Sequence, residues 1–377
     1  MSTVLERPGG AVGTLSPVIS TAGRRGDRDR VDPAQSGFAR LSRQIKAEGL
    51  LDRFVGFYVR KAVFWALVGG AAVAASVALG DSWWQLAVAA VLGIVLTQFA
   101  FMAHEASHRQ IFRSGPANDW AGLFLANLVV GISYSWWMNK HTRHHGNPNV
   151  IGRDPDIEKD TISFLEEDAA QSRGLVRLIT RKQGYLFFPL LLLEGINLHV
   201  HGIRHVVAKQ GVKRRWLEIT LIAVRLVGVV ALVFWAFPPL LAVAFLLVQL
   251  GVFGVYMGAS FAPNHKGMPL IPRGARVDFL ERQVLTSRNI RGGRLIDASM
   301  GGLNYQIEHH LFPSMARPAL ARTQQIVREY CRENDIPYTE TGLFQSYGIV
   351  IDYLNRVGLA ARDPFDCPMV SAYRRRD

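Results

Sequence analysis

Four long apolar runs divide the chain into two pairs that are separated by polar sequence. The runs cover residues 63–79, 84–103, 216–237 and 240–262. A helix needs about 20 mostly apolar residues to cross the hydrocarbon core of a bilayer, so the pattern predicts four transmembrane helices. The links within the pairs, at 80–82 and 237–239, are short. Each pair is therefore expected to form a hairpin, and the expected fold class is an all-α integral membrane protein.

Basic residues flank the two pairs and are absent from the links inside them. Lys213, Arg214 and Arg215, for example, stand directly before the second pair. Because short cytoplasmic segments carry an excess of Lys and Arg, both termini are predicted to be cytoplasmic. This asymmetry explains most of the net charge of +13. No nucleic-acid-binding motif accompanies the charge, so no nucleic-acid partner is expected.

Two further apolar stretches, 120–138 and 185–198, are expected to lie in the membrane interface or to re-enter it. A full crossing by the first stretch would place the polar segments that flank it on opposite sides of the membrane. The second stretch contains Pro189 and Glu194, which disfavour a span and favour an interfacial helix. The first stretch ends in aromatic residues typical of an interface belt: Tyr134, Trp136 and Trp137.

The remaining sequence predicts three segments. Residues 1–36 are rich in Gly, Ser, Arg and Asp and have no apolar core, so a disordered tail is expected rather than a signal peptide. Residues 37–335 are predicted to form the membrane domain, and residues 336–377 a cytoplasmic C-terminal segment. Amphipathic patterns at 318–334 and 341–357 predict helices. A cytoplasmic helical cap is therefore expected at the ends of the spans.

Histidines gather in three boxes, HEASH at 104–108, HTRHH at 141–145 and QIEHH at 306–310. Residues three and four apart share one face of a helix, so the members of each box are expected to point to one place. Imidazole is a ligand for iron, zinc and copper, and three boxes on one side of a membrane are rarer than an isolated, solvated HxxxH. Together they predict a centre of two metal ions. His265 stands alone after the fourth apolar run. The proposed ligands are His104, His108, His141, His144, His145, His265, His309 and His310.

Several further residues are candidates for weaker roles at this centre. Gln306 shares the predicted face of the third box. Glu105 and Glu308 lie within boxes and could accept hydrogen bonds from ligand imidazoles, or could form ordinary surface salt bridges. His201 and His205 are four residues apart and could add a ninth ligand, or could simply lie at the level of the lipid headgroups.

A dimetal centre at the ends of apolar helices suggests chemistry on a chain held in the protein or the bilayer. Two iron ions with imidazole ligands can accept two electrons, activate O2 and remove hydrogen from unactivated C–H bonds, while the protein supplies placement and excludes water. A metal transporter would instead place its polar ligands in mid-membrane, and here the boxes fall at the helix ends.

The chain resembles the membrane fatty acid desaturase family over roughly residues 60–330. The resemblance rests on the HEASH box, HTRHHGNPNVIGRDPD at 141–156, APNHKGMP at 262–269 and GLNYQIEHHLFPSMARP at 302–318. The last motif is similar to the front-end and linoleoyl-CoA branch, and to actinobacterial acyl-CoA desaturases. The resemblance implies a di-iron enzyme, with the eight histidines as ligands, that introduces a cis double bond into a long acyl chain carried on coenzyme A or on a lipid. Spacing alone does not separate this reaction from membrane hydroxylation, which remains the alternative.

The resemblance also implies roles for residues beside the ligands. Gln306 stands where other branches have histidine and is a poorer iron ligand, so a water held by Gln306 or Asn264 could complete the site. Asp154 and Asp156 are implied to orient imidazoles. Many eukaryotic front-end members carry a fused haem domain with a His-Pro-Gly-Gly motif, whereas this chain has Arg-Pro-Gly-Gly at 7–10. Electrons from NAD(P)H are then expected to arrive through a separate reductase, ferredoxin or both, at a bacterial plasma membrane.

Overall fold

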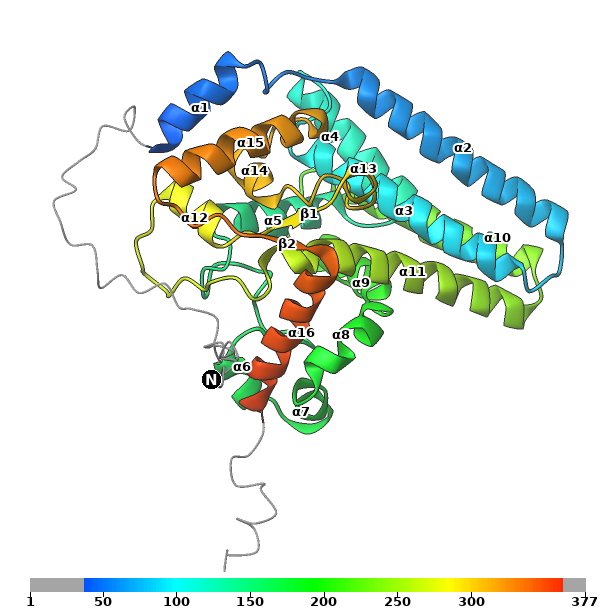
Figure 1. Cartoon of the computed structure of the whole chain (residues 1–377). Helices are drawn as coiled ribbons and strands as arrows, with labels where there is room; N and C mark the ends of the chain where they lie inside the picture. Colours follow the sequence, from blue (N-terminus) through cyan, green and yellow to red (C-terminus); the bar gives the residue numbers. More distant parts are fainter. Residues whose placement is uncertain (1–36, 362–377) are drawn as a thin grey trace, which may run out of the picture.

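A computed structural model describes residues 37–361, which are mostly helical (Figure 1). The predicted tail at 1–36 lies outside the described residues, as do residues 362–377. The first eight helical elements are α1 (Gly37–Ala47), α2 (Val55–Leu79), α3 (Gln85–Ser107), α4 (Gly115–Leu123), the π-helix η2 (Phe124–Val130), α5 (Tyr134–Gly146), α6 (Glu166–Ala170) and α7 (Gly174–Thr180). The next are α8 (Gln183–Leu191), α9 (Glu194–Ala208), α10 (Arg215–Ala236), α11 (Pro239–His265), α12 (Phe279–Leu285), α13 (Arg294–Ser299), α14 (Gln306–Leu311), α15 (Arg317–Glu333) and α16 (Leu343–Leu359). Two short parallel strands that the sequence did not predict, β1 (Asn289–Arg291) and β2 (Glu340–Gly342), pair with Asn289 opposite Glu340.

Helices α2, α3, α10 and α11 are each long and apolar enough to cross a membrane, with 25, 23, 22 and 27 residues. They confirm the four predicted apolar spans, although the observed helices extend beyond the predicted ends. Helix α2 begins at Val55 rather than at residue 63, and α11 continues to His265 rather than to residue 262. The ends of α3 and α11 are packed inside the protein. Polar residues at these ends therefore avoid contact with lipid. The last turns of these two spans therefore carry His104 and His265.

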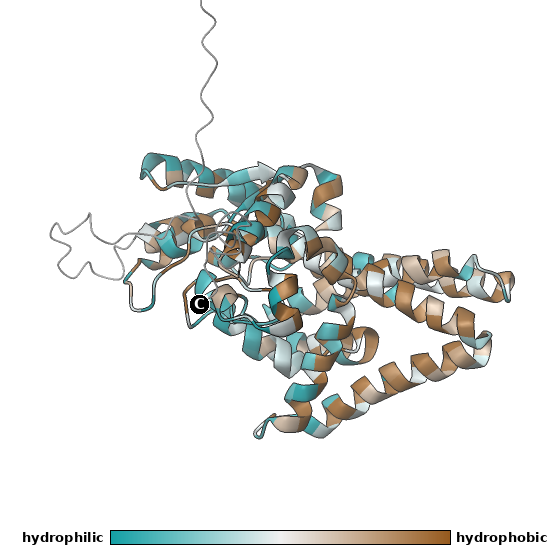
Figure 2. Cartoon of the chain, turned by 90° about the horizontal axis from the view of Figure 1, so that it is seen from below, coloured by the Kyte–Doolittle hydropathy of each residue, from teal (hydrophilic) through white to brown (hydrophobic). Residues whose placement is uncertain are grey.

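The four spans differ in how much of their surface the protein covers. In α3 and α11, 56% and 44% of the apolar window is buried, whereas only 6% and 11% is buried in α2 and α10. Helix α3 packs closely on α11, because a Cβ atom at Gly93 would lie 2.7 Å from the Gln249 carbonyl oxygen. Small residues permit such close approach between membrane helices. The spans project from a more hydrophilic body with their apolar surfaces exposed (Figure 2).

The two shorter apolar stretches each form a bent pair of helices. Residues 115–130 (α4 with η2) and α5 meet at 116°, and α8 and α9 meet at 75°. Gly131, with φ of 95°, ends η2 in a left-handed conformation that favours glycine. The first stretch is thus broken between Val130 and Tyr134, as expected for a re-entrant or interfacial segment rather than for one straight span.

The remaining helices form a body at one end of the spans (Figure 1). Its largest apolar cluster joins α1, α12, α14 and α15 through buried residues such as Leu41, Val284, Ile307 and Val327. Helix α16 packs on α8 through Val350 and Leu354, which share a cluster with Phe187. The body thereby fixes α14, which carries the third histidine box, against the ends of the spans.

Candidate metal centre

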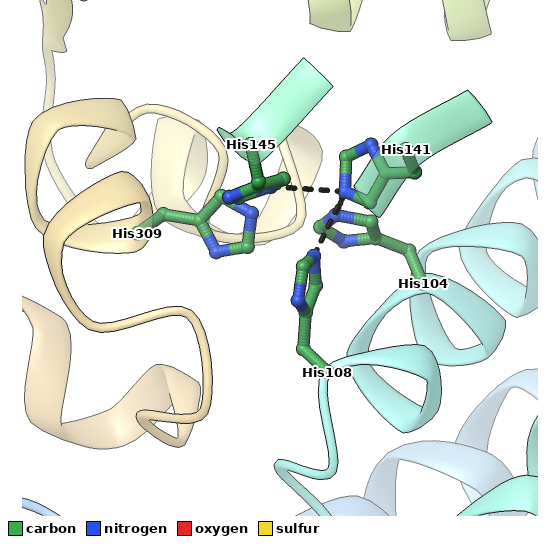
Figure 3. Close-up of side chains that lie close together, drawn as sticks. All are labelled: His104, His108, His141, His145 and His309. Carbon is green, nitrogen blue, oxygen red and sulfur yellow. Dashed lines mark hydrogen bonds between the residues drawn. The ribbon is translucent and has the colours of Figure 1, made fainter. Parts of the chain in front are cut away.

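The eight predicted histidines converge from four segments of the chain into two groups. They come from the end of α3, from α5, from the last residue of α11 and from α14. In each group, every histidine offers a ring nitrogen that lies within 4.8 Å of the others. Group one consists of His104, His108, His141, His145 and His309, shown in Figure 3, and group two of His144, His265 and His310.

The division corrects the expectation that each box points to one place. His144 and His145 belong to different groups, and so do His309 and His310. Successive residues on an α-helix point about 100° apart, since 3.6 residues complete a turn. Adjacent histidines in the second and third boxes therefore belong to different groups, whereas His141 and His145, one turn apart, stay together.

The imidazoles of group one crowd around His141. Its Nε2 atom lies 2.9 Å from His104 Nε2, 2.8 Å from His108 Nε2 and 3.1 Å from His145 Nε2 (Figure 3). Metal–nitrogen bonds of about 2.1 Å place ligand nitrogens roughly 3 Å apart. The spacing of these nitrogen atoms is therefore what a shared metal ion requires.

Two nitrogens of group one have no hydrogen-bond partner among the described residues. They are His309 Nε2 and His145 Nδ1, and both are buried. Buried polar atoms are nearly always paired, because an unpaired one loses its hydration without compensation. His309 Nε2 in particular would be satisfied by a metal ion in group one, so the donor set fits a bound cation.

The imidazoles of group two are equally close. His265 Nε2 lies 3.3 Å from His144 Nε2 and 3.1 Å from His310 Nε2. Each Nδ1 atom meets an acceptor outside the group, which leaves the Nε2 lone pairs directed inward. The Nδ1 contacts, all at 2.9 Å, are His144 with Asp154 Oδ1, His265 with the Thr286 carbonyl oxygen and His310 with Gln283 Oε1.

Asp154 and Asp156, which the resemblance implied as residues that orient imidazoles, both approach His144. Asp156 Oδ2 lies 3.4 Å from His144 Nδ1. Asp154 also accepts hydrogen bonds from the backbone amides of Asn149 and Asp156. The loop after α5 thus builds a fixed acceptor for one imidazole. Gln283 and Thr286 were not found from the sequence, because nothing in the stretch around them distinguishes an acceptor for histidine from an ordinary polar residue.

Gln306 and Asn264 lie beside group two. Gln306 Nε2 is 2.9 Å from His265 Nε2, and Gln306 Oε1 accepts a hydrogen bond of 3.0 Å from Asn264 Nδ2. Asn264 Nδ2 also lies 3.2 Å from the Ser260 carbonyl oxygen. Rotation of the Gln306 amide group by 180° would direct its oxygen, instead of its nitrogen, towards His265 Nε2. This side chain can therefore face a metal ion or a water bound there.

Of the alternatives for Glu105 and Glu308, the structure shows contacts with other side chains rather than with ligand imidazoles. Glu105 forms a buried ion pair of 2.6 Å with Arg317 Nε. Glu308 accepts hydrogen bonds from Asn289 Nδ2 at 2.7 Å and from the Tyr338 hydroxyl at 2.8 Å, and burial raises its pKa to about 7. Both carboxylates point off the histidine faces of their helices and join the boxes to neighbouring elements.

His201 and His205 lie outside both groups, in agreement with the alternative in which they are not ligands. The His201 side chain is 39% exposed, lies 3.8 Å from Asp160 and stacks on Trp136 with ring centroids 6.2 Å apart. Helix α9 instead buries His199, whose Nδ1 atom is 2.5 Å from the Gly195 carbonyl oxygen.

Burial favours the neutral form of most of these imidazoles, but at His144 the Asp154 and Asp156 carboxylates outweigh burial and raise the pKa. Burial lowers the pKa of His108 to about 3, and it lowers the pKa values of His309 and His310 well below the ordinary range, with neighbouring histidines adding to the effect. A neutral imidazole keeps the lone pair that a metal ion needs. The imidazoles with a lowered pKa are therefore in the protonation state that binds cations.

An apolar cavity borders group one. Its lining includes His104, Ala126, Val130, Trp137 and Phe261. Tyr134 also lines it, whereas Trp136 stacks on His201. Its walls are almost entirely apolar, as is typical of sites that hold apolar ligands.

Comparisons with known proteins agree with this geometry. A delta-6 fatty-acid desaturase of Caenorhabditis elegans is 29% identical over 339 residues, which are 85% of this chain and 74% of that protein. A delta-8 fatty-acid desaturase of Helianthus annuus is 26% identical over 358 residues, 89% of this chain and 76% of that protein. A delta-5 fatty acid desaturase of Caenorhabditis elegans is 27% identical over 348 residues, with coverage of 86% and 74%. The family model described as fatty acid desaturase matches residues 81–342, which include all eight histidines, and the chain therefore belongs to the fatty acid desaturase family.

Proposed function

We propose that this chain is an oxygen-dependent desaturase that introduces a cis double bond into a long acyl chain. Two hydrogens leave neighbouring carbons, and O2 is reduced to two molecules of water with two electrons and two protons from outside. The observation that carries the proposal is the position of His104, which belongs to group one and also lines the apolar cavity. The cavity would hold part of an acyl chain directly beside a metal ion.

The proposed cofactor is a pair of iron ions, one held by each histidine group. Bound iron would supply the redox chemistry that activates O2 and abstracts hydrogen from an unactivated C–H bond. The chain supplies the imidazoles, and in group two it fixes them from outside through Asp154, Gln283 and the Thr286 carbonyl. Such outer contacts set the orientation of ligand imidazoles.

The chain also determines where the acyl carbons lie. Trp137 stacks on His141 with centroids 4.5 Å apart and forms part of the cavity wall next to the ligands. The apolar wall excludes water and limits how far the substrate can shift. Desaturation rather than hydroxylation requires the second C–H bond to come within reach after the first is broken, and this depends on placement at the ångström scale.

We further propose that electrons come from NAD(P)H through a separate reductase, a ferredoxin or both. The acyl group is carried on coenzyme A or on a membrane lipid. Apolar helices and the family make the chain an integral membrane protein. The proposed orientation, in a bacterial plasma membrane, places both termini and the histidine groups in the cytoplasm, as the distribution of Lys and Arg indicates.

Expression in a host that lacks the product tests this function directly. Gas chromatography of the host's fatty acids is expected to show a new olefinic acyl chain, which should be absent with the His309→Ala variant. A hydroxylated acyl chain as the main product would replace desaturation by the hydroxylase alternative. No new product, with the chain present in the membrane and supplied with reductant, would contradict both.

A further inference from the structure

The apolar helix α10 carries two ionisable residues that contact the interior of the protein. Most of α10 faces outward, with 11% of its apolar window buried. Charged side chains inside spans are costly and are usually retained for a function. Glu218 and Arg225 are seven residues apart, about two turns, so both can face the same neighbour. That neighbour is the 116° bend between η2 and α5.

Glu218 binds the start of α5. Its Oε2 atom accepts hydrogen bonds from Ser133 Oγ at 2.7 Å, from Ser135 Oγ at 3.1 Å and from the Ser135 amide at 3.3 Å. Ser133 also caps α5 by accepting a hydrogen bond from the Trp136 amide. A carboxylate is stabilised at the N-terminus of a helix, where the free amides carry partial positive charge.

Arg225 binds the end of η2 with the opposite polarity. Its Nε atom donates a hydrogen bond of 2.7 Å to the Val129 carbonyl oxygen, and His199 Nε2 lies 3.2 Å from the next carbonyl oxygen, that of Val130. The last carbonyls of a helix lack partners within it and attract cations. A Cβ atom at Gly131 would lie 3.3 Å from Arg225 Cγ and 2.9 Å from a Leu226 methyl group, so the bend and α10 are closely packed.

The bend held in this way is also a wall of the apolar cavity. Val130, Ile132 and Tyr134 line the cavity, and they lie between the points that Arg225 and Glu218 hold. We propose that Glu218 and Arg225 are positioning residues that fix this wall and so select which acyl carbons lie beside group one. The inference rests on the proposed desaturase function and adds to it the residues that determine the position of the double bond.

The test compares the positions of the double bond made by variants of the full chain expressed in the same host. Arg225→Met and Glu218→Leu remove the contacts, while Arg225→Lys and Glu218→Gln keep a donor and an acceptor. The matched control is Val224→Ala, next to Arg225 on a surface that is 59% exposed. A shift of ~1 Å can change a reaction rate about 100-fold, so we expect the ratio of minor to major positional isomer to rise about tenfold in Arg225→Met.

The conservative variants and Val224→Ala are expected to keep isomer ratios nearer to that of the unaltered chain. A merely structural role would lower the total product and leave the ratio unchanged, so an unchanged ratio in both Arg225→Met and Glu218→Leu would overturn the inference. If the product is an alcohol, the position of its hydroxyl group serves for the same comparison.

Hydrogen–deuterium exchange provides a second measurement that needs no turnover and no metal. Amides at 127–136 are expected to exchange faster in Arg225→Met and Glu218→Leu than in Val224→Ala. Equal exchange in all three would overturn the inference even where the chain folds poorly. If the two variants exchange faster but the unaltered chain forms no product, the role of Glu218 and Arg225 in holding the bend is supported and the desaturase function is contradicted.

Discussion

The two histidine groups differ in what holds their imidazoles in place. All three imidazoles of group two are fixed through Nδ1 by acceptors that belong to the protein. Group one has five imidazoles around a common point, and two buried nitrogens, on His145 and His309, lack a partner among the described residues. Group one also borders the apolar cavity through His104.

This difference indicates that the two groups depend to different extents on a bound metal ion to hold their imidazoles in place. Group two is preorganised, because each imidazole has its outer hydrogen bond before any cation binds. Group one relies more on the cation itself to satisfy its buried nitrogens. Because group one lies beside the cavity, we infer that its geometry matters most directly to the substrate, while group two forms the more rigid half of the centre.

The largest expected effect is the loss of a ligand from either group. His309→Ala and His310→Ala change adjacent residues that serve group one and group two respectively. Each is expected to reduce desaturation below detection, because the two metal positions act together, while the chain stays in the membrane. Product analysis and iron content of purified protein test this, with two iron ions per chain expected before substitution.

The control for this prediction is His201→Ala, which removes an imidazole outside both groups. It is expected to keep most of the activity and both iron ions. One zinc ion and no iron in the well-purified, unaltered chain would contradict the di-iron assignment. Loss of iron on His201→Ala would contradict the membership of the two groups.

A smaller effect is expected when an outer acceptor of group two is changed. Asp154→Asn keeps the shape of the side chain but removes the charge that faces His144 Nδ1. Changes to such outer partners typically weaken metal binding about 10–100-fold. Iron release to a chelator is therefore expected to accelerate for one of the two ions. Equal acceleration for both ions would break the distinction between the groups.

The sequence predicted the members of the centre but not their division. Box spacing and the apolar runs identified the eight histidines and the four spans, because helical periodicity is local in sequence. The adjacent pairs, such as His309 and His310, already implied two directions by the geometry of a helix. Which imidazole joins which group, however, depends on how α3, α5, α11 and α14 pack, and that packing is set by contacts far apart in the chain.

The outer contacts were still harder to predict. Gln283 lies in a charged stretch without a histidine, and the acceptor at Thr286 is a backbone oxygen that every residue type possesses. Glu105 and Glu308 show the reverse case, because their neighbours in sequence are proposed ligands but their neighbours in space are Arg317 and Asn289. A buried carboxylate binds whichever donor the tertiary packing brings to it.

Removal of metal provides a direct comparison between the groups. After treatment with a chelator, amides around His104 and His309 are expected to gain more hydrogen exchange than amides around His265, because group one loses the ion that satisfies its nitrogens. Exchange measured on the full chain with and without added iron tests this. A larger gain around His265 would reverse the assignment of the preorganised group.

The smallest effect is expected from Gln306→His, which offers group two a fourth imidazole. Gln306 is buried, and its amide nitrogen lies 2.9 Å from His265 Nε2, so a ring at this position can face the same metal ion. Imidazole is a better ligand for iron than a neutral amide. The variant is therefore expected to retain the group two ion longer against a chelator, while desaturation changes little because the cavity beside group one is untouched.

Asn264→Ala is the matched control, since it removes the partner of the Gln306 amide without adding a ligand. Faster loss of iron from Gln306→His than from Asn264→Ala would show that residue 306 does not face the metal, and that group two is complete with three imidazoles and water.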